Sequence, residues 1–133
     1  MGMNPHLPSN DGRPLIVLGC GGHGRVIVQV SHAAGRTVIG FIDDDMALAG
    51  SNVGGLAVLG TSKDAPRLAS EHGAHLLVGI GDNRQRAVRV KEFLTAGLNV
   101  AVAIDPSAVI APDEEIAHGT VVMPGVIINT GCR

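Results

Sequence analysis

The residues best suited to bind a ligand lie in a glycine-rich stretch near the start of the chain. An apolar run at 15–18 is followed by Gly-Cys-Gly-Gly-His-Gly at 19–24, and then by a pattern typical of an amphipathic helix. Glycines let the backbone turn sharply and keep side chains away from anything bound there. A helix N-terminus adds unpaired N–H groups and the positive end of its dipole, which together favour an anion such as phosphate. We therefore expect an anion site at Gly21, Gly22, His23 and Gly24.

Two other interpretations of this stretch stay open. The spacing Gly19-x-Gly21-x-x-Gly24 satisfies the dinucleotide fingerprint, although a single match of this kind is a weak signal. The stretch is also compatible with a tight structural turn that binds nothing. Cys20 lies beside the helix start, where a thiolate is stabilised, but a small residue without chemical function is the simpler interpretation.

Polar and charged residues follow two later apolar runs. Asp43, Asp44 and Asp45 come after the run at 37–42, and Gly81, Asn83 and Arg86 come after the run at 75–80. Carboxylates accept hydrogen bonds from hydroxyl and imide N–H groups, and a guanidinium suits phosphate. In the alternative interpretation the aspartates form a solvated acidic turn and Arg86 is a surface helix residue. The residues alone do not decide between the two.

The elements that position these residues are predicted from hydrophobic periodicity. Apolar runs predict four buried strands, at 15–18, 37–42, 75–80 and 99–104. Helical patterns predict three helices between them, at about 24–34, 65–72 and 84–96. This alternation is typical of a parallel sheet of the Rossmann-like α/β class, in which ligands bind beyond the C-terminal ends of the strands. We therefore expect the three loops to meet at one edge of the sheet.

Several side chains receive structural roles in these helices. Asn83 is expected to be the N-cap of the last helix, and Thr61 or Ser62 to cap the helix at 65–72. The apolar residues of the last helix are spaced to pack on the sheet, namely Ala87, Val88, Val90, Phe93 and Leu94.

After the last predicted strand, the apolar period changes to six. Aliphatic residues recur without exception at Ile104, Ile110, Ile116, Val122 and Ile128. This hexapeptide repeat is typical of a parallel β-helix, in which each aliphatic side chain points inward. Five hexads make fewer than two coils, so we expect further coils past Arg133 to cover Val122 and Ile128. We accordingly interpret the chain as the front part of a longer protein.

Composition narrows the class of protein. The 133 residues carry a formal net charge of −2 and include no Trp, no Tyr and two Phe, which argues against a nucleic-acid-binding surface. Two cysteines, Cys20 and Cys132, do not make a disulfide framework. No apolar run approaches membrane-spanning length, so we expect a cytoplasmic protein with no membrane partner. We divide it into a flexible leader at 1–14, a Rossmann-like domain at 15–103 and the first hexapeptide coils at 104–133.

Taken in order, these motifs resemble the NeuD/PglD group of sugar O- and N-acetyltransferases. The stretches that carry the resemblance are Ile16 to Gly24, Gly40 to Asp44, Val58 to Gly60, Gly79 to Asn83 and the hexads from Ile104. In that group a small α/β domain holds a nucleotide-linked amino sugar, and a trimeric left-handed β-helix binds acetyl-CoA between neighbouring subunits. A β-helix histidine is the general base for acetylation of an amino or hydroxyl group.

The resemblance implies roles for residues of this chain. The turn at Gly21, Gly22, His23 and Gly24 would lie against the diphosphate and the sugar, Asp43 and Asp44 would receive the nucleobase and the ribose, and Gly81, Asn83 and Arg86 would close the same edge. The chain departs from the pattern at the base histidine, whose motif would lie past Arg133. His118 occupies an ordinary repeat position, and His23 suits hydrogen bonding to sugar or phosphate. We therefore assign no catalytic residue and no metal ligand within the chain.

The leading hypothesis is the nucleotide-sugar-binding portion of an acetyl-CoA-dependent sugar N- or O-acetyltransferase, homotrimeric at full length. Two hypotheses from other classes stand beside it. The first is an NAD(P)-type dinucleotide-binding Rossmann module, favoured by the glycine spacing and by Asp43 at the end of the second strand. The second is a non-catalytic trimerisation or scaffold fragment.

Overall fold

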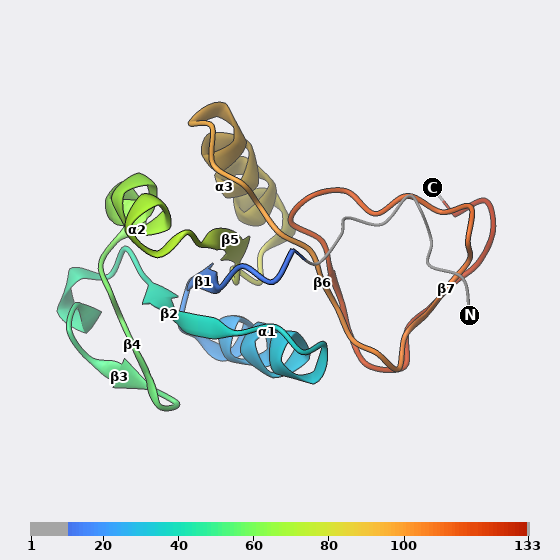
Figure 1. The fold of residues 1–133 in the computed structure, drawn as a ribbon, viewed down its shortest axis with the longest axis horizontal. Coiled ribbons are helices and arrows are strands. Elements are labelled where there is room, and N and C mark those ends of the chain that lie inside the picture. The colour runs from blue at the N-terminus through green and yellow to red at the C-terminus, as the bar shows by residue number, and fades with distance from the viewer. Residues whose placement is uncertain (1–10, 133) are drawn as a thin grey trace.

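The computed structural model describes residues 11–132, so positions 1–10 of the expected leader lie outside the described part. At the centre is a sheet of three strands, β1 (Leu15–Leu18), β2 (Val38–Ile42) and β5 (His75–Val78), in the order β2-β1-β5 (Figure 1). The strand β1 pairs in parallel with both neighbours, which confirms the expected parallel α/β sheet.

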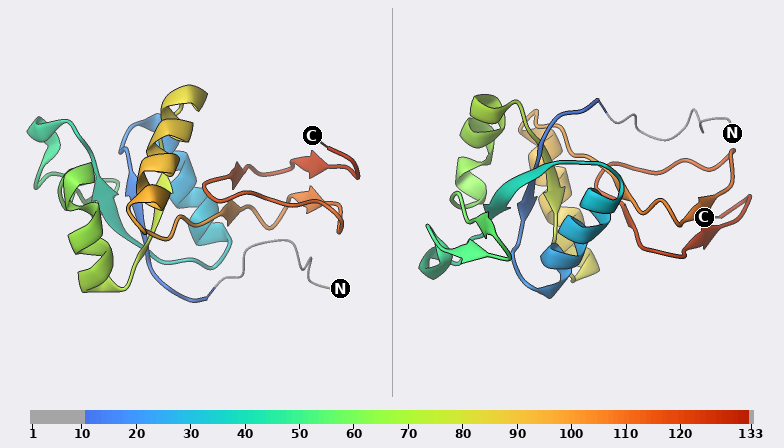
Figure 2. Two further views of the ribbon diagram at one scale, coloured as in Figure 1. Left: turned by 90° about the horizontal axis from the view of Figure 1, so that it is seen from above. Right: turned by 60° about the horizontal axis from the view of Figure 1, so that its bottom comes forward.

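Helices cover both faces of this sheet (Figure 2). They are α1 (Gly22–Ala33), α2 (Ala65–His72) and α3 (Asn83–Thr95). Alternate residues of β1 point to opposite faces. Leu15 and Val17 pack in one core cluster with residues of α1, while Ile16 and Leu18 pack in a second cluster with residues of α2 and α3. None of the helices in the described part is long and apolar enough to cross a membrane.

Capping chemistry sets the helix boundaries. The helix α1 begins two residues earlier than predicted, and α2 has the predicted bounds. Before α2, Thr61 and Asp64 form a capping box around one turn of 3-10 helix, η2 (Ser62–Asp64). The prediction that Asn83 caps α3 is wrong, because the Asp82 side chain accepts a hydrogen bond from the N–H of Gln85 at 2.9 Å. An aspartate one residue earlier already satisfies an unpaired N–H, so Asn83 becomes the first helical residue.

The apolar face predicted for α3 packs on the sheet only in part. Phe93 is buried and Val90 is half-buried against the second core cluster, but Val88 and Leu94 are 56% and 44% exposed and Ala87 is exposed as well. The strand β5 is the edge of the sheet, so the sheet offers α3 only a narrow surface. One side of the helix packs on this surface, and the other side extends beyond it. Exposed apolar side chains therefore remain on α3 at Ala87, Val88 and Leu94.

The segments that flank the three-stranded sheet are short. After β2 come a 3-10 turn η1 (Met46–Leu48) and a hairpin of β3 (Asn52–Val53) and β4 (Leu56–Ala57), and Val58 then bridges Phe41 of β2. The strand predicted at 99–104 is wrong as a continuous element, because only Val100 bridges Leu76 of β5. Beyond Val100 the chain leaves the sheet, and its backbone groups pair with a later segment instead.

That later pairing joins residues eighteen positions apart. The strand β6 (Ala103–Ile104) pairs in parallel with β8 (Val121–Val122), and β7 (Val109–Ile110) pairs in parallel with β9 (Ile127–Ile128). We call residues 103–132 the coil segment. Figure 1 shows its two passes lying along one another, beside the α/β part. Three hexads thus return the chain to the same place.

Side chains alternate along the coil segment. Val109 and Ile127 face outward with 61% and 65% of their surface exposed, whereas Ile110 and Ile128 are half-buried. The expectation that Val122 needs further coils to cover it is wrong, because Val122 is 3% exposed. Its strand pairs with β6 on one side, and the residues next to it, Val121 and Met123, pack against the sheet's core.

Candidate functional site

The order of the strands creates a crevice at one edge of the sheet. The chain passes from β1 to β2 on one side and later places β5 on the other side of β1. The segments that follow β1 and β5 therefore lead to helices on opposite faces of the sheet. This is the topological switch point, where open α/β sheets bind their ligands.

The N-terminus of α1 opens into this crevice without a capping side chain. Its N-cap is Gly21, and within residues 11–132 the N–H groups of Gly21, Gly22, His23 and Gly24 donate no hydrogen bond. We call these four N–H groups the anion cradle. No atom lies within 4 Å of a Cβ built on Gly21 or Gly22, so the backbone is accessible there. A 12-residue helix with free N–H groups and an open approach is well suited to an anion.

Gly24 has a different role, which is close packing. It is buried, and a Cβ at this position would overlap the carbonyl oxygen of Gly19. Gly19 itself has φ +95°, a left-handed conformation that side chains rarely adopt, and a Cβ on Gly79 would lie 2.7 Å from Cα of Gly24. These three glycines let the turn after β1 and the end of β5 touch, which brings the two loops of the crevice together.

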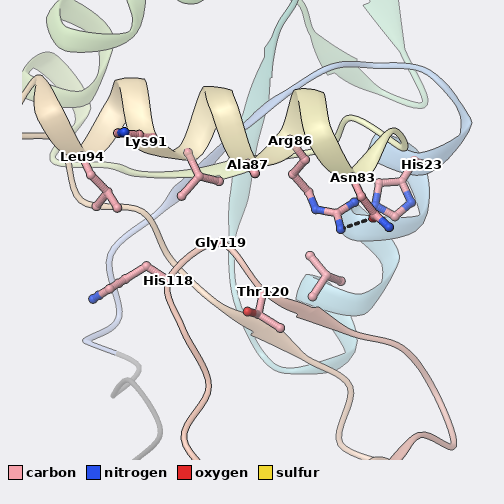
Figure 3. A pocket seen from close by; sticks show the side chains of 11 residues that line it. His23, Asn83, Arg86, Ala87, Lys91, Leu94, His118, Gly119 and Thr120 are labelled. Atoms are coloured by element: carbon pink, nitrogen blue, oxygen red, sulfur yellow. Dashed lines mark hydrogen bonds between the residues drawn. The ribbon is translucent and has the colours of Figure 1, made fainter. Parts of the chain in front are cut away.

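Arg86, Asn83 and Gly81 form the opposite side of the crevice. The guanidinium of Arg86 donates to the carbonyl oxygen of Ile80 at 3.2 Å and to Oδ1 of Asn83 at 2.6 Å (Figure 3). A Cβ on Gly81 would lie 3.8 Å from Cβ of His23, which places the two loops side by side. Arg86 is thus held in place by its own loop before any ligand arrives.

A pocket of about 430 Å³ begins at this crevice and continues along α3 to the coil segment (Figure 3). Polar side chains lie at the crevice end, three apolar residues and Lys91 lie along the helix, and the coil segment forms the far wall. The lining residues are His23, Asn83, Arg86, Ala87, Val90, Lys91, Leu94, His118, Gly119, Thr120 and Val121. Its volume is that of a small-molecule site. The ring atom Nδ1 of His118 lies 2.9 Å from the carbonyl oxygen of Val100.

Asp43 lies against the glycine turn. Its Oδ2 accepts hydrogen bonds from the backbone N–H of Cys20 at 3.1 Å and from the Cys20 thiol at 3.3 Å, and its Oδ1 accepts from the N–H of Asp45 at 2.9 Å. Partial burial opposes ionisation, but the backbone hydrogen bonds from Asp45 and Cys20 prevail and lower the pKa of Asp43. Burial, together with the Asp43 hydrogen bond and charge, raises the pKa of the Cys20 thiol. Cys20 is therefore a buried hydrogen-bond donor and not a thiolate nucleophile.

Asp44 points to other partners. Its carboxylate accepts hydrogen bonds from the backbone N–H of Ser62 at 2.8 Å and from the Ser62 hydroxyl at 3.0 Å, and it forms an ion pair with Arg89 of α3. Both aspartates thus already have partners within the protein. Of the nine candidates from the sequence, His23, Asn83 and Arg86 line the pocket, and Gly21, Gly22 and Gly81 lie on the open edge.

Sequence reasoning missed two features of this region. The first is Arg89, which does not line the pocket but forms the ion pair with Asp44; its position one turn after Arg86 on α3 was the available signal. The second is the wall formed by residues 118–121. The hexad period predicts which side chains of the coil point inward, but it does not tell which part of the coil will face α3.

Comparison with known proteins agrees with the fold. Residues 14–93 match the family described as the PglD N-terminal domain. Among solved structures, a point mutant of perosamine N-acetyltransferase from Caulobacter crescentus, in complex with CoA and GDP-perosamine, is 35% identical with a TM-score of 0.78. The acetyltransferase domain of PglB from Neisseria gonorrhoeae is 32% identical with a TM-score of 0.72, and it has also been solved with acetyl coenzyme A.

These alignments cover most of this chain but only about half of the first relative. They include 87% of this chain and 54% of the Caulobacter chain, and 89% of this chain and 62% of the Neisseria chain. The chain therefore spans about half the length of the perosamine enzyme. A search of the curated proteins found no match. The resemblance to the NeuD/PglD group is confirmed, and with well over half of its residues matched the chain belongs to the PglD N-terminal domain family.

Proposed function

We propose that this chain is the nucleotide-sugar-binding portion of an acetyl-CoA-dependent sugar N- or O-acetyltransferase. The observation that carries the proposal is the uncapped N-terminus of α1, which opens at the switch point into a pocket that leads to the coil segment. A nucleotide sugar has its two phosphates between the nucleoside and the sugar. A phosphate site at the mouth of a pocket therefore suits this class of ligand.

Different residues of the site bind different parts of the ligand. The diphosphate lies at the anion cradle, where the free N–H groups of Gly21 and Gly22 and the helix dipole stabilise its charge. Arg86 and His23 flank this position, and the Arg86 guanidinium already has the orientation that its loop imposes. The sugar extends along α3 toward Gly119 and Thr120. Perosamine N-acetyltransferase, solved with GDP-perosamine and CoA, supports this class of substrate.

The coil segment provides the link to the acetyl donor. Parallel pairing at an interval of three hexads supports the first coils of a left-handed parallel β-helix, beginning at residue 104 after an α/β domain at 15–103. In the full-length protein this β-helix forms a homotrimer that binds acetyl-CoA. The outward side chains of Val109 and Ile127 supply apolar surface for contact with another copy. We place the reaction in the cytoplasm, where acetyl-CoA and nucleotide sugars are made.

Acetyl transfer needs a nucleophile, a base and a leaving group. The amino or hydroxyl group of the sugar attacks the thioester carbonyl of acetyl-CoA, a base accepts the proton of the nucleophile, and CoA leaves as the thiol. A general base must reach the proton that it removes. We assign that role to no residue among those described: Nδ1 of His118 lies against a backbone carbonyl, and His23 lies beside the anion cradle.

Calorimetric titration tests the proposal. The chain should bind GDP-sugars or UDP-sugars, and Gly22→Val should abolish this binding because its side chain would occupy the accessible backbone of the cradle. The matched control is Gln29→Val, on the exposed side of the same helix. Binding of NAD in place of nucleotide sugars would favour a dinucleotide-binding module, and self-association without binding of either would favour a scaffold fragment.

A further inference from the structure

The glycine turn is attached to the end of β2 by consecutive backbone groups. The N–H of Gly19 donates to the carbonyl oxygen of Ile42 at 2.7 Å, and the N–H of Cys20 donates to Oδ2 of Asp43 at 3.1 Å. The Asp43 backbone N–H in turn donates to the carbonyl oxygen of Gly60 at 2.9 Å. The carboxylate of Asp43 thus fixes the last peptide before the anion cradle begins at Gly21.

Asp43 carries a negative charge next to a proposed anion site, which needs an explanation. An ionised carboxylate close to an anion site repels the anion, so its presence there disfavours binding by simple electrostatics. Asp43 is half-buried, and each of its two oxygens accepts a hydrogen bond from a backbone N–H. The negative charge of Asp43 is therefore engaged by backbone N–H groups, one in each of the two loops. The next N–H groups, from Gly21 to Gly24, are left without partners in the described part of the chain.

We infer that Asp43 is a positioning residue that holds the anion cradle in its binding conformation, and not a ligand of the ribose or the nucleobase. The assignment rests on the function proposed above. It differs from the role that the family resemblance implies for this residue. It also separates Asp43 from Asp44, whose carboxylate lies with Ser62 and Arg89.

The test measures binding of the diphosphate half and of the nucleoside half of the ligand separately. Inorganic pyrophosphate probes the cradle alone, guanosine and uridine probe the nucleoside site alone, and GDP and UDP probe both. Asp43→Asn should weaken binding of pyrophosphate and of the preferred nucleoside diphosphate by the same factor, about tenfold for one lost charge-assisted hydrogen bond. Binding of the nucleoside should not change. Removal of a repulsive charge without loss of position would strengthen pyrophosphate binding, so weaker binding identifies the positioning role.

Two controls keep the result interpretable. Asp45→Asn removes the same charge from the same loop, where the side chain accepts a hydrogen bond from the N–H of Ala47 and not from the glycine turn, and it should leave pyrophosphate binding within twofold. Cys20→Ala keeps the backbone N–H and removes only the thiol, so it should bind pyrophosphate as the wild type does. Amide hydrogen exchange gives a readout besides affinity, because Asp43→Asn should speed exchange of the Cys20 N–H.

The outcomes distinguish this assignment from the proposed function. Loss of nucleoside binding with unchanged pyrophosphate binding in Asp43→Asn would show a direct contact with the ribose or base and overturn the assignment. Unchanged affinity for every probe would overturn it as well, while leaving the proposed function intact. A wild-type chain that binds neither nucleoside diphosphates nor nucleotide sugars would contradict both.

Discussion

Arg89 of α3 forms an ion pair with Asp44 at the end of β2, and the Ser62 hydroxyl lies within hydrogen-bond distance of both side chains, 3.3 Å from the guanidinium and 3.0 Å from the carboxylate. Three elements distant in the sequence thus meet in one polar cluster. Because α3 begins with Asn83 and carries Arg86 in its first turn, this cluster fixes the helix that presents both residues to the crevice.

A double-mutant cycle on this pair should show coupling. Asp44→Ala and Arg89→Ala should each lower the free energy of unfolding, and their effects should be non-additive by about 0.5 kcal/mol, the scale of a partly exposed ion pair. Urea unfolding of the two single variants and the double variant measures this. Glu92→Ala breaks the neighbouring contact between Arg89 and Glu92 and serves as the comparison. Additive effects of Asp44→Ala and Arg89→Ala would contradict the coupling.

Two glycines of the turn should differ in their response to an added methyl group. Gly24→Ala should lower the free energy of unfolding by at least about 1–3 kcal/mol, because its Cβ would overlap the Gly19 carbonyl oxygen. Gly22→Ala meets open space and should leave the free energy of unfolding nearly unchanged. Thermal and urea unfolding check both variants. Equal destabilisation by the two substitutions would refute the division between packing and accessible glycines.

The shifted pKa values of Cys20 and Asp43 should make the free energy of unfolding fall at both acid and alkaline pH. The pKa of Asp43 is lowered in the folded state, so its contribution to stability is present above the unfolded value near 3.8 and is lost as the pH falls through the lower folded value. The pKa of Cys20 is raised, so its contribution is present below 9.0 and is lost as the pH rises through the higher folded value. Urea unfolding across this pH range should show both losses in the wild type. Asp43→Asn should show a smaller loss at acid pH than the wild type, because only the contribution of Asp43 is removed while Asp64 and Asp105, whose pKa values are also lowered, remain.

Thiol labelling checks the same pair independently. At pH 8, Cys132 is exposed and should react at once with a thiol reagent, whereas Cys20 is 7% exposed and should react slowly. Cys132→Ser isolates the slow phase. Asp43→Asn should then accelerate labelling, because it removes the charge and the hydrogen bond that raise the Cys20 pKa. Rapid labelling of Cys20 in the wild type would contradict the buried thiol.

The outward aliphatic pair of the coil segment should drive self-association. Val109 and Ile127 are register partners on β7 and β9 and are both mostly exposed. Replacing both with glutamate should shift the sedimentation profile toward the monomer, because contiguous apolar surface favours contact with another chain. Val88→Glu, at an exposed apolar position on α3, is the matched control and should not change the sedimentation profile. A monomeric wild type at high concentration would refute this role for the pair.

Local patterns predicted the parts of the molecule whose chemistry is local. The glycine turn, α2 and the six-residue period all follow from residues close in the sequence, and the structure contains each of them. The exposure of Val88 and Leu94 could not be predicted in this way, because it depends on the width of the sheet beneath α3. The partners of Asp43 and Asp44 likewise depend on which backbone groups tertiary packing brings near the end of β2.

The boundary between the sheet and the coil segment has a consequence for protein engineering. Ala101 and Ala103 lie in the same core cluster as β1, and Val121 and Met123, from the second pass of the coil, pack against that cluster. The α1 face of the sheet is therefore completed by residues that a cut at residue 104 would remove. A chimera that joins this α/β portion to the coils of a relative must reproduce the shape of Val121 and Met123, because the two parts share a hydrophobic core and no linker separates them.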